Sequence, residues 1–241
     1  MSTRASFFHA AFAPDLTQAD SRESQAFSVR PVWDAGRFAD EQIRRLVRQV
    51  FFPGWPRPAH HVAFAAVDEK TDTAAICMRV GEILHVQAPG NICIVDANPS
   101  LDASLPAADG VAVLRPGGNG CESLREQTQR ISSRLWHMPH TIFFQSNEQS
   151  SGTSGLETQM SRLRAAFDYT AIHVPPAGLC NDAVLLGQLS DGVVLIVEAN
   201  STRRAAAQKV KEILQAANVR LMGTVLNGRT FPIPHGIYHK L

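Results

Sequence analysis

The sequence predicts an α/β fold in which a doubly wound, mostly parallel sheet is flanked by helices. Short apolar runs rich in β-branched residues alternate along the chain with stretches of helical periodicity, as in parallel strands joined by crossover helices. The chain has 241 residues, of which 44% are hydrophobic, so it can bury a substantial core. These observations favour a single globular domain with less ordered ends.

Strands are expected where the apolar runs are nearly continuous, because a strand buried on both faces shows no polar alternation. Five runs have this character, at residues 62–66, 92–97, 170–174, 192–197 and 221–226.

Helices are expected between the strands, where apolar residues recur at intervals of three and four. The stretches with this spacing are 38–52, 73–85, 156–167 and 203–217. Residues 101–121 are rich in Gly, Pro and Ala, and they predict a loop with room for one short added strand.

The first residues mix Ser, Ala, Pro and single charges without sustained periodicity. Residues 1–35 are therefore expected to form a flexible segment, and residues 36–241 the folded domain. Phe7, Phe8 and Phe12 lie in the first segment. These rings either rest on the domain or form a patch that touches a partner or a membrane, and the first interpretation is favoured.

Composition excludes several classes of protein. The chain has 23 Lys and Arg against 22 Asp and Glu, so it lacks the basic footprint of nucleic-acid binding. Its apolar runs are far shorter than the ~20 residues of a membrane helix, and its start has no secretory pattern. Cys77, Cys93, Cys121 and Cys180 lack the paired spacing of zinc or redox sites, so reduced thiols in a cytoplasmic protein are expected.

Several short motifs carry a resemblance to a known family. They are the bend after the first strand within VAFAAVDEKTDTAAICMRVGEIL (62–84), IVDAN (94–98), FDY (167–169), AIHVPPAG (171–178) and the closing LNGRTFPIPHGIY. Together they resemble the deviant P-loop ATPases of the MinD/ParA type, and within that group the bacterial tyrosine kinases of exopolysaccharide and capsule machinery. The resemblance runs from about Asp40 to the C-terminus, and it implies a P-loop NTPase-like domain.

The P-loop of this family is not kept in the sequence. In one register Lys70 and Thr71 match the family's Lys and Ser/Thr, but Glu69 replaces a glycine. In the second register, favoured by the distance to the next aspartate, the Gly-Lys-Ser/Thr positions hold Asp72, Thr73 and Ala74. A carboxylate at either glycine position would repel phosphate, by about 4 kcal/mol for unit charges ~4 Å apart at an effective dielectric near 20.

The metal positions of the family are also altered. Asp96 matches the first aspartate of the family's Asp-x-Asp, whereas Asn98 stands at the second. His173 stands where the resemblance places the metal-holding aspartate, so a hard oxygen ligand is lost. Asp96 either acts on Mg²⁺ or as a base, or tethers the loop after its strand, and the tether is favoured. A hydrogen-bonded interior histidine is favoured for His173 over a pH-sensitive or metal-binding one.

Two further family positions concern the nucleotide and the phosphoacceptor. Asn227 matches the position that reads adenine, although it is equally plausible as a turn residue before Gly228. Thr73 and Asn227 are therefore the weak candidates for cofactor binding. Tyr238 is the one tyrosine near the C-terminus, where the kinases carry an autophosphorylated cluster, and it is the candidate phosphoacceptor. Anchoring of the tail through its ring is favoured.

A final family position concerns assembly. Glu41 and Arg44 match the first two positions of the family's Glu-x-x-Arg-x-x-Arg oligomerisation helix, but Val47 replaces the last arginine. A homo-oligomer like that of the kinases is therefore an open expectation.

The sequence leads to a main hypothesis and two alternatives. The main hypothesis is a catalytically degenerate relative of the tyrosine kinases, without cofactor or metal, that regulates or scaffolds exopolysaccharide or capsular polysaccharide biosynthesis. Its partners would be proteins of the membrane-bound export or co-polymerase machinery, reached from the cytoplasm or the inner face of the membrane. The first alternative is an active autokinase or ATPase that uses ATP and Mg²⁺ through Lys70, Thr71 and Asp96. The second is nucleotide binding without turnover.

Overall fold

The computed structural model describes residues 35–52, 58–98, 124–145 and 153–228. The strands are β1 (His61–Ala66), β2 (Ile92–Asp96), β3 (Gln129–Ser132), β4 (Leu135–Met138), β5 (Tyr169–Val174), β6 (Gly192–Glu198) and β7 (Leu221–Asn227). The helices are α1 (Ala35–Phe51), α2 (Thr73–Gln87), α3 (His140–Gln145), α4 (Thr153–Ala166), α5 (Asp182–Leu189) and α6 (Arg204–Ala216).

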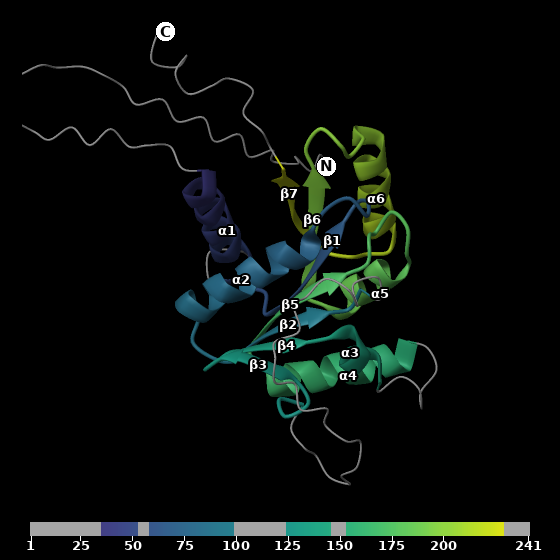
Figure 1. Cartoon of the computed structure of the whole chain (residues 1–241). Coiled ribbons are helices and arrows are strands. Elements are labelled where there is room, and N and C mark those ends of the chain that lie inside the picture. The colour runs from purple at the N-terminus through teal and green to yellow at the C-terminus, as the bar shows by residue number, and fades with distance from the viewer. Residues whose placement is uncertain (1–34, 53–57, 99–123, 146–152, 229–241) are drawn as a thin grey trace, which may run out of the picture. The chain divides into compact units, whose positions relative to one another are not determined.

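The strands form one seven-stranded sheet in the order β3-β4-β2-β5-β1-β6-β7, as Figure 1 shows. All neighbouring strands run parallel except β3, which pairs antiparallel with β4. The predicted α/β fold is therefore confirmed. Each of the five predicted strands matches an observed strand to within one residue at either end, and each of the four predicted helices to within three.

Four short elements were not predicted, namely β3, β4, α3 and α5. The two strands have four residues each and the two helices six and eight, which is too short for a period to be read from the sequence. The predictions for residues 101–121, for the N-terminal phenylalanines and for Tyr238 concern positions outside the described residues.

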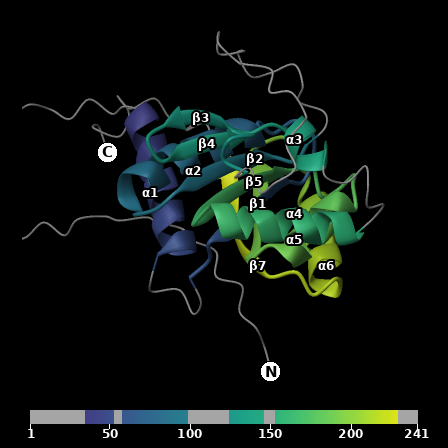
Figure 2. The same cartoon turned by 90° about the horizontal axis from the view of Figure 1, so that it is seen from below.

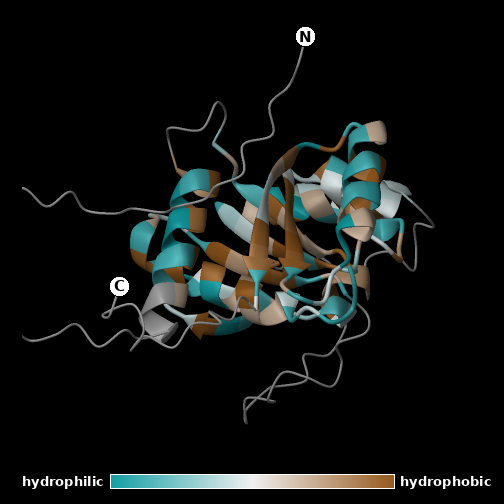
Figure 3. Cartoon of the chain, turned by 90° about the horizontal axis from the view of Figure 1, so that it is seen from above, coloured by the Kyte–Doolittle hydropathy of each residue, from teal (hydrophilic) through white to brown (hydrophobic). Residues whose placement is uncertain are grey.

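Helices cover both faces of the sheet, as a parallel sheet requires (Figures 1 and 2). Val62 and Phe64 of β1 face a core that α1 and α2 complete. The alternate residues Ala63 and Ala65 face a second core, which α3, α4, α5 and α6 complete. The strands are accordingly the most hydrophobic part of the molecule, while the helices are hydrophilic on their outer sides (Figure 3).

Three cysteines lie in the described part of the chain, and none of them forms a disulfide. Cys77 and Cys93 are buried, and burial raises the pKa of each thiol above its ordinary value, so neither is a reactive thiolate. Cys180 is exposed. No helix among the residues described is both long and apolar enough to cross a membrane.

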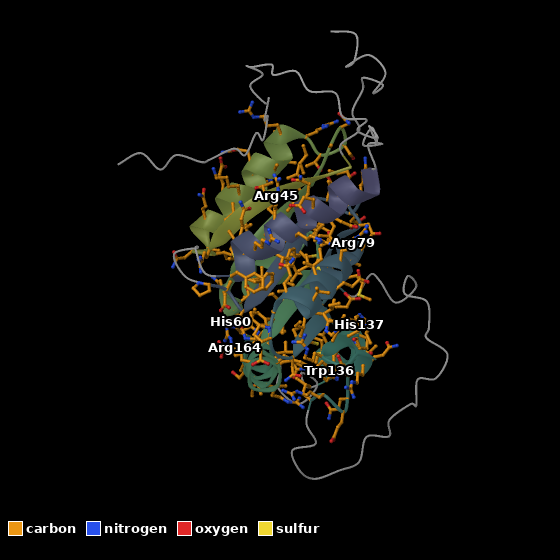
Figure 4. All side chains as sticks on the ribbon, turned by 90° about the vertical axis from the view of Figure 1, so that its left-hand side faces the viewer. Arg45, His60, Arg79, Trp136, His137 and Arg164 are labelled. Atoms are coloured by element: carbon orange, nitrogen blue, oxygen red, sulfur yellow. The ribbon has the colours of Figure 1, made fainter. Side chains whose placement is uncertain are left out.

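Polar contacts join the amino ends of the central strands. The Asp191 carboxylate accepts the backbone N–H groups of His60 and His61 at 2.7 and 2.8 Å. The imidazole Nδ1 of His61 lies 3.1 Å from the Thr170 hydroxyl. Figure 4 shows His60 and Arg164 at this end, and Arg164 also approaches Asp191. Burial lowers the pKa of His61 to about 4, although Asp191 opposes the shift.

This lowered pKa predicts a loss of stability in mild acid. The unfolded chain takes up a proton at His61 below pH ~6.5, whereas the folded chain does so only near pH 4. The stabilisation is therefore complete above pH ~6.5, and it is lost as the pH falls toward 4. Between pH 7 and 5 we expect the free energy of unfolding to fall by on the order of 1–2 kcal/mol from this residue.

Urea denaturation of wild type and His61→Gln over this pH range measures the effect. The variant should show a shallower pH dependence, with a remainder from His137, whose pKa burial also lowers. Ala205→Gln, at an exposed position of α6, is the control and should keep the wild-type slope, because it changes no titratable group. Equal slopes for wild type and His61→Gln would contradict the assignment.

Candidate functional site

The candidate site lies at the carboxyl edge of the sheet, around β1. The chain leaves β1 toward β2 on one side and returns from β5 to β6 on the other, so β1 marks a topological switch point. Ligands of doubly wound sheets bind in the crevice outside the strands at such a point. The loops that border it follow β1 at residues 67–72, β2 at residues 97–98 and β5 at residues 175–181.

The loop after β1 is fixed by its neighbours. Val67 donates its N–H to the Ile196 carbonyl at 3.1 Å, and a Cβ on Gly178 would lie only 2.5 Å from the Val67 carbonyl oxygen. The Asp68 carboxylate accepts the Thr202 hydroxyl at 2.8 Å and the Lys70 N–H at 3.2 Å. The loop is therefore closely packed, and one of its acidic side chains is used to hold it in place.

A second acidic side chain of the loop, that of Asp72, caps the helix that follows. The Asp72 carboxylate accepts the Ala75 N–H at 3.0 Å, so it satisfies one of the free donors at the start of α2. It also places a negative charge at the positive end of the helix dipole, where a phosphate would otherwise be favoured. Capping by Asp72 and binding of a phosphate exclude each other, because the N–H group at the start of α2 that binds the carboxylate would also have to bind the phosphate.

The remaining loop residues are divided between surface and interior. Glu69 and Lys70 are exposed, and Ala74 is half-buried. Thr73 is buried, with its hydroxyl 3.5 Å from the Thr71 carbonyl. Thr71 is only 8% exposed, and its hydroxyl has no hydrogen-bond partner among the described residues. In the first register Lys70 and Thr71 would act together on a nucleotide. In the structure the Lys70 side chain lies at the surface and the Thr71 hydroxyl is buried.

Asp96 and His173 form a buried pair on the neighbouring strands β2 and β5. The Nδ1 atom of His173 lies 3.1 Å from the Asp96 carboxylate, and the same oxygen accepts the Asn98 N–H at 3.0 Å. Ala97 also donates to the His173 carbonyl at 2.8 Å. The Asp96 carboxylate thus accepts from the loop that follows its strand, and the His173 ring is buried beside it.

The sequence did not predict a role for His137, a further buried polar residue beside the pair of Asp96 and His173. It is buried on β4, beside β2, and the charge of Asp96 acts against the burial that lowers its pKa. Figure 4 shows it next to Trp136. Nothing in the stretch LWHM pointed to this position, because the approach to Asp96 depends on the pairing of β4 with β2. Among the residues described, no three His, Cys, Asp or Glu side chains gather as metal ligands.

Asn227, the candidate for adenine binding, also has a partner within the chain. The Asn227 amide donates to the Glu198 carboxylate at 2.9 Å, which joins the ends of β7 and β6. Gly228 follows with φ of +65°, and a Cβ there would collide with the Glu198 carboxylate. Asn227 therefore combines a side-chain bridge with the turn position expected of it. Glu198 was not predicted from the sequence.

The positions that resemble the oligomerisation helix lie on α1. Glu41 and Arg44 are both exposed, but the nearest ion pair of Glu41 is with Arg45, at 3.5 Å. Val47 is fully buried in the core beneath the helix. An exposed pair within a helix contributes only a few tenths of a kcal/mol. The third position of the motif is therefore part of the hydrophobic core of this chain.

Comparison with known proteins places this fold. No protein-family model matches the sequence. The chain is 35% identical over 65 residues to tyrosine-protein kinase YwqD of Bacillus subtilis, and 34% identical over 65 residues to tyrosine-protein kinase CpsD of Streptococcus agalactiae. Each match covers 27% of this chain, and it spans only about a quarter of the relative, 27% of YwqD and 28% of CpsD.

Solved structures resemble the chain over a larger part. The kinase domain of VpsO matches with a TM-score of 0.60 and 18% identity, covering 81% of this chain and 98% of that domain. The kinase domain of the Escherichia coli tyrosine kinase ETK matches with a TM-score of 0.54 and 12% identity, covering 82% and 80%. A chain of the MinC:MinD cell division protein complex of Aquifex aeolicus matches with a TM-score of 0.51 and 12% identity, covering 71% of this chain and 70% of that chain.

The chain therefore has the P-loop fold of the MinD/ParA group. Within that group the resemblance to the bacterial tyrosine kinases is confirmed, since the local sequence matches and the fold agree.

Asp72 gives the first test of the site. Asp72→Ala removes the cap of α2 and should lower the free energy of unfolding by about 1 kcal/mol. Asp72→Asn keeps the cap but removes the charge, so its stability should stay near wild type. Its affinity for inorganic phosphate, measured by titration calorimetry, should rise by about tenfold or more. An unchanged phosphate affinity in Asp72→Asn would show that the charge is not what excludes anions.

Asp96 gives the second test. Asp96→Ala leaves the His173 ring and the Asn98 N–H without their buried acceptor, so we expect a loss of about 2–4 kcal/mol in urea denaturation. Glu69→Ala, in an exposed position of the neighbouring loop, is the control and should change stability by less than about 0.5 kcal/mol. If Asp96→Ala were as stable as this control, the tether would have no energetic role.

Proposed function

We propose that this chain is a catalytically degenerate relative of the bacterial tyrosine kinases, and that it acts by binding other proteins rather than by transferring phosphate. The observation that carries the proposal is the Asp72 carboxylate at the amino terminus of α2, which takes the amide donor and opposes the negative charge of a phosphate.

The residues around Asp72 support the same proposal. Phosphoryl transfer depends on positioning and on neutralising charge, so a site for it needs cations and free ligand groups near the phosphates. Here the Asp96 carboxylate is committed to His173 and to the loop after β2, and the Asn227 amide is committed to Glu198. ATP with Mg²⁺ fits this arrangement poorly, because the Asp96 carboxylate and the Asn227 amide that it would need already have partners inside the chain.

The proposed pathway comes from the likeness to the kinases. A protein that keeps their fold but not their nucleotide site can still occupy their place among the proteins of exopolysaccharide or capsule synthesis. We propose a regulatory or scaffolding role there, through contacts with the membrane-bound export or co-polymerase proteins. A shared fold does not by itself transfer a function.

One observation favours a second candidate, an autokinase or ATPase of the same pathway. The buried hydroxyl of Thr71 lies beside the start of α2 without a partner in the described part of the chain, and Lys70 is exposed next to it. A bound ligand would satisfy this hydroxyl. Such an enzyme would use Lys70, Thr71 and Asp96 with ATP and Mg²⁺, and Tyr238 as phosphoacceptor.

Titration calorimetry and a phosphorylation assay distinguish the two candidates. The main proposal expects no submicromolar Mg²⁺-dependent ATP binding, and no phosphate on Tyr238 above a control without protein. The second candidate expects phosphate on Tyr238 that is abolished in Lys70→Ala and kept in Lys209→Ala, an exposed lysine on α6. Tight ATP binding by the wild-type chain would overturn the main proposal.

Complementation tests the role in the pathway. In cells of the source organism that lack the gene, Lys70→Ala should restore polysaccharide production as well as wild type does. Failure of Lys70→Ala, with wild type and Lys209→Ala both active, would favour the enzyme. Normal polysaccharide in the strain that lacks the gene would contradict the pathway assignment.

A further inference from the structure

The two edges of the sheet differ in how their backbone groups are protected. At the β3 edge, the Arg130 guanidinium donates to the backbone carbonyls of Ser132 and Ser133 at 3.1 and 2.9 Å. The pairing of β3 with β4 also shifts register between Arg130 and Ser132. A short strand, a bulge and a charged side chain are the usual devices that keep an edge from pairing with another chain.

The β7 edge lacks two of these devices, the short strand and the charged side chain, although its pairing with β6 also shifts register, between Val193 and Val194. Its residues, LMGTVLN, include no charge and no proline, and the strand is seven residues long. Thr224 and Leu226 are exposed, the latter to 55%, and a Cβ added at Gly223 would meet nothing within 4 Å. A long, uncharged and exposed edge strand is a template for a further strand.

The direction of its backbone groups follows from the contacts with β6. Asn227 uses its carbonyl to accept the Ala199 N–H at 2.8 Å, so its backbone groups point toward β6. Because backbone groups alternate in direction along a strand, those of Val225 also point toward β6, and those of Thr224 and Leu226 point outward. No hydrogen bond from the described residues reaches these outward groups.

We propose that β7 pairs antiparallel with β7 of a second copy of this chain, which joins the two sheets across a two-fold axis. The regular part of the strand sets the register, with Val225 opposite Val225 of the second copy. Thr224 of each copy then lies opposite Leu226 of the other, and these two residues are the ones whose backbone groups point outward. In this register the backbone N–H and C=O groups of Thr224 and Leu226, which point outward, all gain hydrogen-bond partners.

A second copy suits this edge because the strand carries no charge. Two identical charged strands would place like charges opposite each other, whereas LMGTVLN places none. In the proposed register Gly223 lies opposite Asn227, so the bulkier residue faces the residue without a side chain. The contact is short, so we expect weak association, with a dissociation constant of about 1–100 µM.

Analytical ultracentrifugation of the full chain at about 1–200 µM tests the proposal. We expect a monomer–dimer equilibrium in EDTA without nucleotide, which makes the outcome independent of whether the chain binds ATP. Leu226→Lys should weaken the dimer by about tenfold or more, because it sets like charges at both ends of the pairing. The matched control is Ile131→Lys on β3, where a residue of 45% exposure occupies the protected edge, and it should leave the dimer unchanged.

Cross-linking tests the register. In a background with Cys121→Ser and Cys180→Ser, Val225→Cys should form a disulfide-linked dimer under mild oxidation, because the two residues face each other across the axis. Three results would overturn the proposal: a monomer at all concentrations, a dimer that Leu226→Lys does not weaken, or a dimer that Val225→Cys does not cross-link. A monomer that dimerises only when the chain is ended at Gly228 would mean that the chain's own C-terminal residues cover β7, and it would overturn the proposal as well.

A dimer lost on Glu41→Ala or Arg44→Ala would instead place the contact on α1. The proposed function would survive each of these failures, because it rests on the nucleotide site.

Discussion

The carboxyl edge of the sheet is stabilised by polar groups that bind one another, and the properties of the candidate site depend on this constraint. Parallel strands deliver the ends of β1, β2, β5, β6 and β7 to the same edge, where backbone and side-chain donors need partners. In this chain Asp68, Asp72 and Asp96 accept from neighbouring donors. Because these carboxylates already bind donors of the chain, fewer polar groups of the site remain to bind a ligand.

At the start of α2, the stabilisation of the fold by the Asp72 cap can be compared with the repulsion between its carboxylate and a phosphate. A capping carboxylate contributes about 1 kcal/mol to stability, and a surface charge at a helix end contributes a similar amount. The repulsion between that carboxylate and a phosphate oxygen at contact distance is about 4 kcal/mol at an effective dielectric near 20. The gain for the fold is thus smaller than the cost to anion binding, so the proposed loss of phosphate binding needs only one residue and no large change of the scaffold.

Much of the fold could be predicted from the sequence, because long strands and helices in a doubly wound sheet carry their own hydrophobic period. The apolar run of β6 and the stripe of α6 are of this kind. The four-residue strands β3 and β4 depend instead on pairing with their neighbours, so no local pattern marks them.

The residues of the candidate site likewise divide into those whose place the sequence indicates and those whose contacts depend on the strand order. A tether at Asp96 was predicted from its place at the end of a strand. The cap at Asp72 was not predicted, although an Asp directly before a predicted helix is a usual cap. The partnership of Asp96 with His173, the approach of His137 and the bridge from Asn227 to Glu198 each join different strands. Such contacts become visible only when the strand order is known, since β2 and β5 are neighbours in the sheet but not in the chain.

The separation of these contacts also bears on the proposed degeneration of the nucleotide site. Asp72 acts through the amide of Ala75 on α2, while His173 acts through the carboxylate of Asp96 on β2. The two contacts have no residue in common, so neither requires the other, and restoring one would leave the second in place. Removing a buried partner costs more than a surface change, because the group left behind has no solvent to replace it. The pair of Asp96 and His173 would therefore resist reversion more strongly than the exposed loop, and a nucleotide admitted at α2 would still lack a free carboxylate at β2 for its Mg²⁺.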